Sequence, residues 1–322
     1  MLRIGTRGSQ LALWQARAVA AQLEATAHAR CELVTIRTGG DRLADAALGE
    51  VGGKRLFVKE LEDALLSGTI DLAVHSAKDM SATLPDGLVL AAVLPRDDPR
   101  DALILPAART PPPADAPLGT LLGSTPRIGT SSVRRVAQLH RVFPQATFGP
   151  IRGNVDTRLR KLDAGQFDAI VLAAAGLRRL GFDARISALI PSDVSVPAPG
   201  QGTIAVQAVA SRDDLRALVA GINDADAWVT LEAEHALVAA LGGGCQIPLG
   251  ALASIVDGET LELSAVVTSL DDEHEVRAVA FGGRHDAAAL GERVAQELRD
   301  GGAGAILDGV RDLQAPVKGL QP

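Results

Sequence analysis

The chain of 322 residues has few cysteines and few aromatic residues: two cysteines, two tryptophans, six phenylalanines and no tyrosine. Two cysteines cannot build a disulfide framework. Because there is also no CxxC motif or cysteine and histidine cluster, we expect no metal site. The scarcity of aromatic rings and the formal net charge of −7 argue against general nucleic-acid binding, which uses basic surfaces and stacked rings.

Long apolar runs are missing as well. No segment reaches the roughly 18 uninterrupted apolar residues of a membrane span, and the first ten residues, MLRIGTRGSQ, contain no apolar signal-peptide core. We therefore expect a cytoplasmic protein that does not enter a membrane. The length and the 47% of hydrophobic residues indicate two or three domains with sizeable cores.

The charge is unevenly distributed along the chain. Between Arg127 and Arg185, eleven arginines and lysines stand against four aspartates, although the whole chain is acidic. A basic segment of this kind predicts an anionic small ligand that binds locally.

The tetrapeptide RIGT occurs twice, at 3–6 and at 127–130. Each copy leads into a turn with serine and then into a helical pattern, so that Ser9 in the first copy, and Ser131 or Ser132 in the second, can cap a helix. Two similar strand–turn–helix units imply two similar domains. The free amides at each helix start can also hold an anion.

Strand and helix patterns alternate through the first two thirds of the chain, which is typical of α/β sheets. The other expected strands are 31–38, 70–76, 87–95, 167–176 and 202–209, and clear helical patterns cover 58–68 and 155–165. From Asp224 onward we expect a small α+β domain, with a helix at 226–241, three antiparallel strands near 249–256, 261–268 and 275–281, and a helix from Asp286 to Arg299. Trp14 shares a helix face with Leu11 and Ala18, so we expect it in the core.

The stretch VHSAKDMSATLP, residues 74–85, follows a buried strand pattern. Its strand delivers Ser76, Lys78 and Asp79 to the carboxyl edge of a sheet, where α/β proteins usually bind ligands. An acid beside a lysine can protonate a leaving group or stabilise a cation. An ordinary surface loop with a weak ion pair is the alternative.

Several arginines lie where predicted strands meet helices. Guanidinium groups at such junctions can converge on one sheet edge and bind carboxylates with two hydrogen bonds. Solvated helix faces are the alternative, but the repeated placement favours a polyanion site. The residues are Arg134, Arg135, Arg152, Arg158, Arg178 and Arg179.

The two cysteines stand in different surroundings. Cys245 lies in GGGCQIPLG, after three glycines and shortly before Pro248, so we expect its thiol on a bare, accessible loop. Cys31 lies in an apolar strand pattern and is expected to be inert packing.

Nine motifs together resemble, in the same order, the porphobilinogen deaminase family, also called the hydroxymethylbilane synthases. The resemblance extends from the first residues to about Gly250 and more loosely beyond. The motifs are TRGSQLALWQ, TGGD, GGKRLFVKELE, DLAVHSAKDM, IGTSSVRR, RGNVDTRL, AAAGLRRLG, APGQG and GGGCQIPLG.

The resemblance implies an α/β fold of two domains like periplasmic binding proteins, with mixed sheets, and a small C-terminal α+β domain with a three-stranded antiparallel sheet. The first domain would comprise residues 1–98 and 197–216. The second, arginine-rich domain would comprise 99–196. The third, 217–322, would carry the anchoring cysteine.

The resemblance also implies the chemistry. Four porphobilinogen molecules would condense, with loss of ammonia, onto a dipyrromethane cofactor attached to Cys245, and hydrolysis would release hydroxymethylbilane. Asp79 matches the catalytic aspartate. The residues implied for the cofactor are Lys78, Asp79, Ser131, Ser132, Arg134, Arg135, Arg152 and Arg158; those implied for the substrate are Arg7, Ser9, Arg152 and Arg179. A monomer without nucleic acid or membrane partners is expected.

Two features remain open from the sequence. Met80 and Ser81 replace the valine and proline usual in the family after the aspartate, which leaves the rigidity of that loop in doubt. A two-lobed anion-binding receptor or effector domain without catalysis is the competing interpretation, but it needs neither Cys245 nor a third domain.

Overall fold

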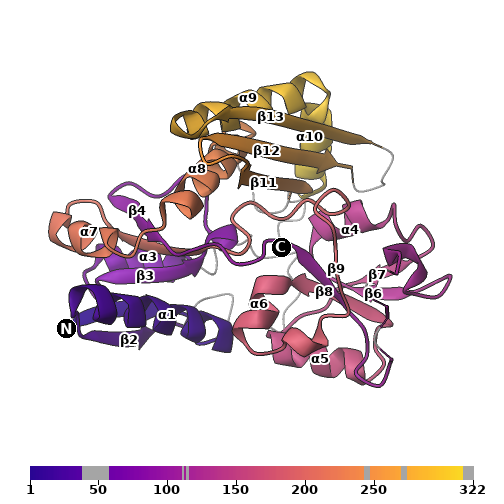
Figure 1. The fold of residues 1–322 in the computed structure, drawn as a ribbon, viewed down its shortest axis with the longest axis horizontal. Coiled ribbons are helices and arrows are strands. Elements are labelled where there is room, and N and C mark those ends of the chain that lie inside the picture. The colour runs from indigo at the N-terminus through magenta and orange to yellow at the C-terminus, as the bar shows by residue number, and fades with distance from the viewer. Residues whose placement is uncertain (38–57, 111, 114–115, 243–246, 270–273, 315–322) are drawn as a thin grey trace, which may run out of the picture.

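The computed structural model of the chain describes residues 1–37, 58–110, 112–113, 116–242, 247–269 and 274–314, with backbone only for 311–314. These residues form two α/β domains side by side and a third, smaller domain that lies across them (Figure 1). Residues 38–57 and 243–246, which include Asp41, Lys54 and Cys245, lie outside the described part of the chain.

The first sheet has the strand order β2-β1-β3-β10-β4. β1 is parallel to β2 and β3, whereas β10 is antiparallel to both of its neighbours. Ile4, Leu72 and Val206 form part of its fully covered core. The strands are β1 (Leu2–Thr6), β2 (Cys31–Thr35), β3 (Leu72–Ser76), β4 (Leu88–Val93) and β10 (Ile204–Val209), and the helices are α1 (Gln10–Ala27), α3 (Lys59–Leu66) and α7 (Asp213–Ala220).

The second sheet repeats this scheme in the order β7-β6-β8-β5-β9. β6 is parallel to β7 and β8, and β5 is antiparallel to β8 and β9. The predicted pair of similar α/β domains with mixed sheets is therefore confirmed. The elements are β5 (Asp101–Ile104), β6 (Arg127–Gly129), β7 (Thr147–Gly149), β8 (Ala169–Ala173), β9 (Ala188–Leu189), α4 (Val133–Leu139), α5 (Val155–Asp163) and α6 (Ala174–Arg179).

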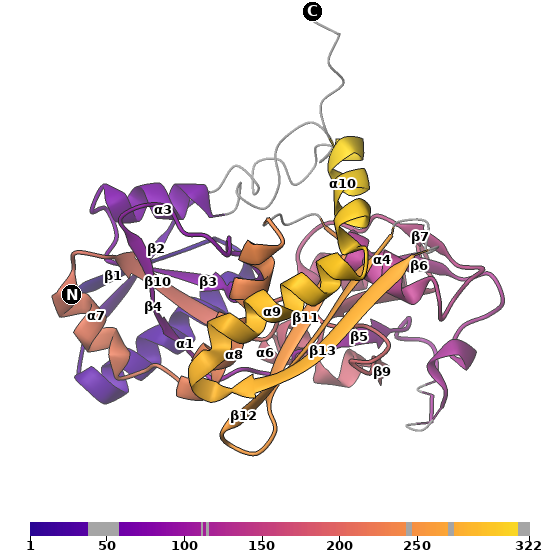
Figure 2. The same ribbon diagram turned by 90° about the horizontal axis from the view of Figure 1, so that it is seen from above.

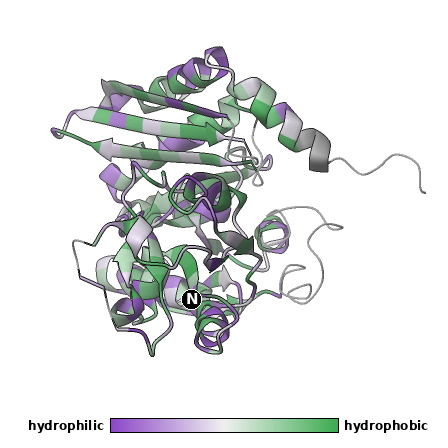
Figure 3. Ribbon diagram, turned by 90° about the vertical axis from the view of Figure 1, so that its right-hand side faces the viewer, coloured by the Kyte–Doolittle hydropathy of each residue, from purple (hydrophilic) through white to green (hydrophobic). Residues whose placement is uncertain are grey.

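The third domain contains the predicted antiparallel sheet, in the order β11-β12-β13. Helices α8 and α9 pack on one of its faces (Figure 2). Hydrophobic and hydrophilic residues alternate along its strands (Figure 3), which is typical of a sheet with one covered face. The elements are α8 (Ala225–Ala240), β11 (Leu249–Ile255), β12 (Thr260–Thr268), β13 (Glu275–Gly283), α9 (Ala287–Asp300) and α10 (Ala303–Gln314), and the last of these was not predicted.

The helix starts agree with the predicted capping serines. Ser9 accepts a hydrogen bond from the amide of Ala12 at 3.2 Å, and Ser132 accepts one from the amide of Arg135 at 3.5 Å. Ser131 does not cap; its Oγ donates to the carbonyl of Ile151 at 2.9 Å and accepts from the amide of Ile151 at 3.1 Å. Of the two candidates, Ser132 is therefore the cap of α4.

A buried carboxylate joins the third domain to the other two. Glu234 of α8 is fully buried. Its Oε1 accepts from Arg96 Nη1 at 2.6 Å and from the Ala253 amide at 2.8 Å, and its Oε2 accepts from the Gly200 amide at 2.6 Å. Arg96 and Gly200 belong to the segments that connect the domains, so this ion pair holds both connections against α8.

Candidate active site

The candidate residues of the first domain follow two neighbouring parallel strands. Arg7 and Ser9 come directly after β1, and Lys78 and Asp79 come directly after β3. Because β1 and β3 are paired in parallel, both groups emerge at the same edge of the sheet. Burial is the main cause that lowers the pKa of His75, and the charges of Asp79 and Arg7 act on the same imidazole in opposite directions.

Asp79 ends a single turn of 3-10 helix, Ala77–Asp79, and is half-buried. The next residue, Met80, donates its amide hydrogen bond to the Ala77 carbonyl at 3.0 Å and is 5% exposed. Its side chain packs in an apolar cluster with Val93, Ala205 and Leu231, the last of which belongs to α8. Met80 thus fixes the loop beside Asp79 against the third domain, although the proline usual at the next position is absent.

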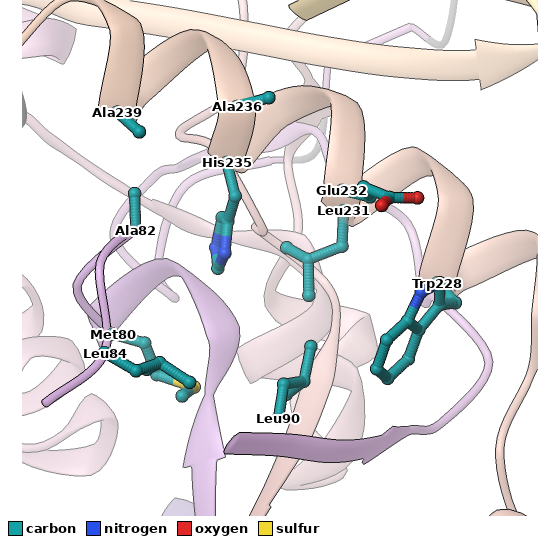
Figure 4. A pocket seen from close by; sticks show the side chains of 10 residues that line it. All are labelled: Met80, Ala82, Leu84, Leu90, Trp228, Leu231, Glu232, His235, Ala236 and Ala239. Carbon is teal, nitrogen blue, oxygen red and sulfur yellow. The ribbon is translucent and has the colours of Figure 1, made fainter. Parts of the chain in front are cut away.

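A cavity of about 290 Å³ lies behind this loop, between it, β4 and α8. Figure 4 shows the side chains of Met80, Leu90 and Leu231 around it, with the ring of His235 pointing inward. Burial lowers the pKa of His235, partly offset by the charge of Glu234. Because the walls are mostly apolar, the cavity does not suit a ligand with several carboxylates.

The candidate residues of the second domain also gather at one sheet edge. Parallel strands β6, β7 and β8 are followed, respectively, by the segment of Arg134 and Arg135, by Arg152, and by α6 with Arg179. Arg158 lies on α5, which begins shortly after Arg152. These strand–helix junctions therefore lie along one edge of the second sheet, and polyanion binding by their guanidinium groups stays a prediction.

Arg134 and Arg135 are buried, and both bind Asp101 at the start of β5. Asp101 Oδ2 accepts from Arg134 Nη2 at 2.8 Å, and Oδ1 accepts from Arg135 Nε at 3.0 Å and Nη2 at 2.8 Å. Burial by itself would raise the pKa of Asp101, but the two guanidinium charges outweigh it and hold the pKa well below its usual range. The two arginines are thus oriented by a carboxylate of the protein.

Arg158 interacts electrostatically with charged residues of both domains. Its Nε donates to the Gly153 carbonyl at 2.8 Å. Burial, reinforced by the charge of Arg135, lowers the pKa of Arg158 to about 10, while the charge of Asp79 acts in the opposite direction. Asp79 of the first domain is therefore within electrostatic reach of Arg158. We call Arg134, Arg135 and Arg158 the arginine cluster.

Arg179 takes part in a contact between the domains. Its side chain is 7% exposed, its Nη2 donates to the Gly202 carbonyl, and its Nε lies 3.6 Å from Asp97 Oδ2. Its Cζ lies 5.8 Å from the centre of the Trp14 ring. The expectation that Trp14 belongs to the core is wrong, because this ring is at the domain boundary and 38% exposed.

The remaining predicted residues are placed as follows. The backbone carbonyl of Arg152 accepts from Lys161 Nζ at 3.2 Å, and its side chain is half-buried. Cys245 lies between the end of α8 and β11 but outside the described residues, so its exposure stays a prediction. Cys31 lies on β2, where burial is the main cause that raises the pKa of its thiol, as expected of an unreactive cysteine.

Sequence reasoning missed three polar residues of this region: His75, Asp101 and Gln201. All three are buried and hydrogen-bonded to other polar side chains. His75 belongs to the motif DLAVHSAKDM and Gln201 to the motif APGQG, and Asp101 directly precedes the apolar residues 102–105. The available signal was a polar residue in a segment otherwise expected to be buried.

Within the described ranges, no group of three or more histidine, cysteine, aspartate or glutamate residues is placed to hold a metal ion. In the same part of the chain, no helix combines the length and apolar character needed to cross a membrane.

Comparison with known proteins identifies two matching family models. The model described as porphobilinogen deaminase, dipyromethane cofactor binding domain, matches residues 2–217. The model described as porphobilinogen deaminase, C-terminal domain, matches residues 228–300.

Solved structures give a weaker likeness. Immunogenic lipoprotein A from Vibrio vulnificus is 12% identical, with a TM-score of 0.41 over 73% of this chain and 100% of that chain. The substrate binding protein of an amino acid ABC transporter is 14% identical, with a TM-score of 0.36 over 69% of this chain and 90% of that chain. Likeness at this level says nothing of what the chain binds.

Curated relatives match over almost their whole length. The porphobilinogen deaminase of Syntrophobacter fumaroxidans is 46% identical over 309 residues, 96% of this chain and 97% of the relative. That of Chromobacterium violaceum is 47% identical over 308 residues, 95% of this chain and 97% of the relative. With two family models and full-length relatives in agreement, the chain belongs to the porphobilinogen deaminase family.

Proposed function

We propose that this enzyme condenses four porphobilinogen molecules, with loss of ammonia, and releases hydroxymethylbilane by hydrolysis. The observation that carries the assignment of roles is that Asp79 and the arginine cluster each follow the carboxyl ends of parallel strands in their own domain, while the charge of Asp79 acts on Arg158. Porphobilinogen and the growing chain carry two carboxylates on every ring. A site with more guanidinium groups than carboxylates suits such a ligand.

The residues fit a dipyrromethane cofactor. Three guanidinium groups of the arginine cluster stand against one nearby buried carboxylate, Asp101, and Arg158 is desolvated enough to depress its pKa. Carboxylates of the cofactor would supply the missing negative charge. The cofactor, held through Cys245, supplies the primer onto which new rings are added. Lys78, Arg152 and the hydroxyls of Ser131 and Ser132 complete the proposed set.

Asp79 is the proposed catalytic residue. As ammonia leaves porphobilinogen, positive charge develops on the pyrrole ring of the substrate. A fixed carboxylate beside the ring nitrogen stabilises that charge more than it stabilises the neutral ground state, so it lowers the barrier. The turn Ala77–Asp79, fastened by Met80, keeps the carboxylate in place before the substrate arrives.

Arg7, Ser9 and Arg152 are proposed to bind the carboxylates of the incoming substrate. They emerge after β1 and β7, on the two sides of the site. Arg179 is assigned to the same set by the resemblance. The hydrogen bond to the Gly202 carbonyl engages one of the five N–H donors of the Arg179 guanidinium, so a substrate carboxylate would bind the remaining donors.

We propose the division into residues 1–98 with 197–216, 99–196 and 217–322. The return of β10 to the first sheet supports the discontinuous first domain. We also propose a cytoplasmic monomer without a nucleic-acid partner. The low cysteine count supports the cytoplasm, the net charge of −7 argues against nucleic-acid binding, and the family resemblance supports the monomer. A receptor without catalysis is disfavoured, because it does not explain why residues 2–217 match the cofactor-binding domain of an enzyme family.

Replacing Asp79 tests the assignment. Asp79→Asn should retain the covalently bound cofactor, measured by intact-mass spectrometry, but lose nearly all turnover of porphobilinogen, because a neutral amide cannot balance a developing cation. Asp86→Asn, at an exposed position farther along the same segment, is the control and should keep wild-type turnover. Near-normal turnover of Asp79→Asn would remove the proposed role.

A further inference from the structure

The APGQG motif, residues 198–202, has no role in the proposed function. Gln201, its fourth residue, is 1% exposed, and Gly200 and Gly202 on either side have φ angles of +72° and +93°. A Cβ at Gly200 would lie 2.9 Å from the Lys78 amide nitrogen, and one at Gly202 would lie 2.3 Å from the Asp97 carbonyl oxygen. The two glycines therefore bring Gln201 against both the turn of Asp79 and the connection between the domains.

The side-chain amide of Gln201 has one favourable orientation. Its Nε2 donates to the Pro99 carbonyl at 2.6 Å and to Asp101 Oδ1 at 2.9 Å, and its Oε1 accepts from Lys78 Nζ at 3.4 Å. If the amide were flipped, an oxygen would face the carboxylate and a nitrogen would face the ammonium group. The surrounding charges thus fix the amide in place.

The two charged partners of Gln201 lie on opposite sides of the site. Lys78 precedes Asp79 in the first domain, and Asp101 begins the first strand of the second domain. Asp101 in turn orients Arg134 and Arg135. An unbroken series of hydrogen bonds therefore connects the segment of Asp79 with the arginine cluster, and Gln201 is its middle member.

We infer that Gln201 is a positioning residue that holds Lys78 at a fixed position relative to Asp101. It touches neither substrate nor cofactor in this role; it keeps the turn of Asp79 at a fixed place relative to the guanidinium groups opposite. The inference rests on the proposed function, since it takes Asp79 and the arginine cluster to be the two halves of one active site.

Gln201→Met tests the inference, because methionine has a similar length but neither donates nor accepts the two charged hydrogen bonds. A hydrogen bond to a charged partner corresponds to about a ten- to hundred-fold change in a rate constant. We expect kcat to fall by about that factor, KM to change by less than about three-fold, and the mass of the bound cofactor to be unchanged.

Gln138→Met is the matched control. Gln138 is also a buried amide with two hydrogen bonds, from its Nε2 to the Val196 carbonyl at 3.1 Å and to its Oε1 from the Val196 amide at 2.7 Å. It should lose a comparable amount of stability in urea unfolding while retaining kcat. If both variants lose kcat in proportion to their stability, or if Gln201→Met retains wild-type kcat, the inference is wrong.

Gln201→Glu is a second variant of nearly unchanged size. It keeps an oxygen toward Lys78 but places another against Asp101 where a donor stood, so kcat should fall at least as far as in Gln201→Met. Wild-type kcat in this variant overturns the inference. A wild-type enzyme that lacked turnover would instead refute the proposed function, and the inference with it, so the two failures are distinguishable.

Discussion

The buried imidazole of His75 predicts a specific loss of stability in mild acid. His75 Nε2 lies 3.0 Å from Gln207 Oε1, and Gln207 Nε2 donates to Glu62 Oε1 at 3.3 Å. Because that second bond turns Oε1 of Gln207 toward His75, the imidazole is the donor. Burial, opposed by this hydrogen bond and by the charge of Asp79, lowers the pKa of His75 to about 4.

The direction of this pH effect on stability follows from the protonation of His75 in the folded and unfolded states. In the folded chain His75 stays neutral down to about pH 4, whereas the unfolded imidazole, with an ordinary pKa of 6.5, takes up a proton on the way down. The unfolded state therefore binds more protons between these values, and stability is full above pH 6.5 and falls as the pH drops toward 4. Between pH 7 and pH 5 the contribution is about 2 kcal/mol.

The assay is urea unfolding at pH 7 and pH 5, followed by circular dichroism, for the wild type and for His75→Gln, which keeps a donor at the position of Nε2 but cannot titrate. The free energy of unfolding of the wild type should fall by about 2 kcal/mol more than that of the variant. His28→Asn, at an exposed position with φ of 51° that asparagine tolerates, should behave as the wild type. Equal pH dependence of wild type and His75→Gln would refute the reasoning.

Two further predictions concern the segment around Asp79. Met80→Ala should lower the free energy of unfolding, measured by urea titration, by about 2–5 kcal/mol, because it removes a buried side chain and leaves a cavity. Leu66→Ala, at a position 52% exposed, is the control and should change the same free energy by less than about 0.5 kcal/mol. Gly200→Ala should reduce both stability and kcat, because its Cβ would push the backbone of Lys78. Gly181→Ala has a similar φ of +73° but open space around it, so it should reduce stability only. Equal kcat in the two glycine variants would contradict the proposed link between Gly200 and the turn of Asp79.

The strands that could be predicted are those that are apolar in themselves. Residues 70–76 and 202–209 contain the apolar runs Leu72–Val74 and Ile204–Val206, so β3 and β10 were expected from local pattern alone. β5 was not, because it is four residues long and begins with Asp101. Its burial depends on partners that lie far along the chain, in β8 and β9, and local periodicity carries no information on such pairing.

The candidate site, like the fold, could be predicted only in part from the sequence. The placement of Asp79 and of the arginines at sheet edges could be expected, because parallel strands bring their carboxyl ends together. The partners of the arginines could not. Arg134 and Arg135 bind Asp101, and Arg179 lies over Trp14, and both contacts depend on how the domains are connected. Tertiary contacts, which composition does not reveal, determine which guanidinium N–H donors already bind partners within the protein.

The central claim is that Cys245 carries a covalently bound dipyrromethane. Intact-mass spectrometry of the purified, untreated protein tests it most directly. The measured mass should exceed that of the sequence by two pyrrole units derived from porphobilinogen, and this excess should be lost in Cys245→Ser but not in Cys31→Ser. A wild-type chain at its sequence mass, or an excess that persists in Cys245→Ser, would contradict the account.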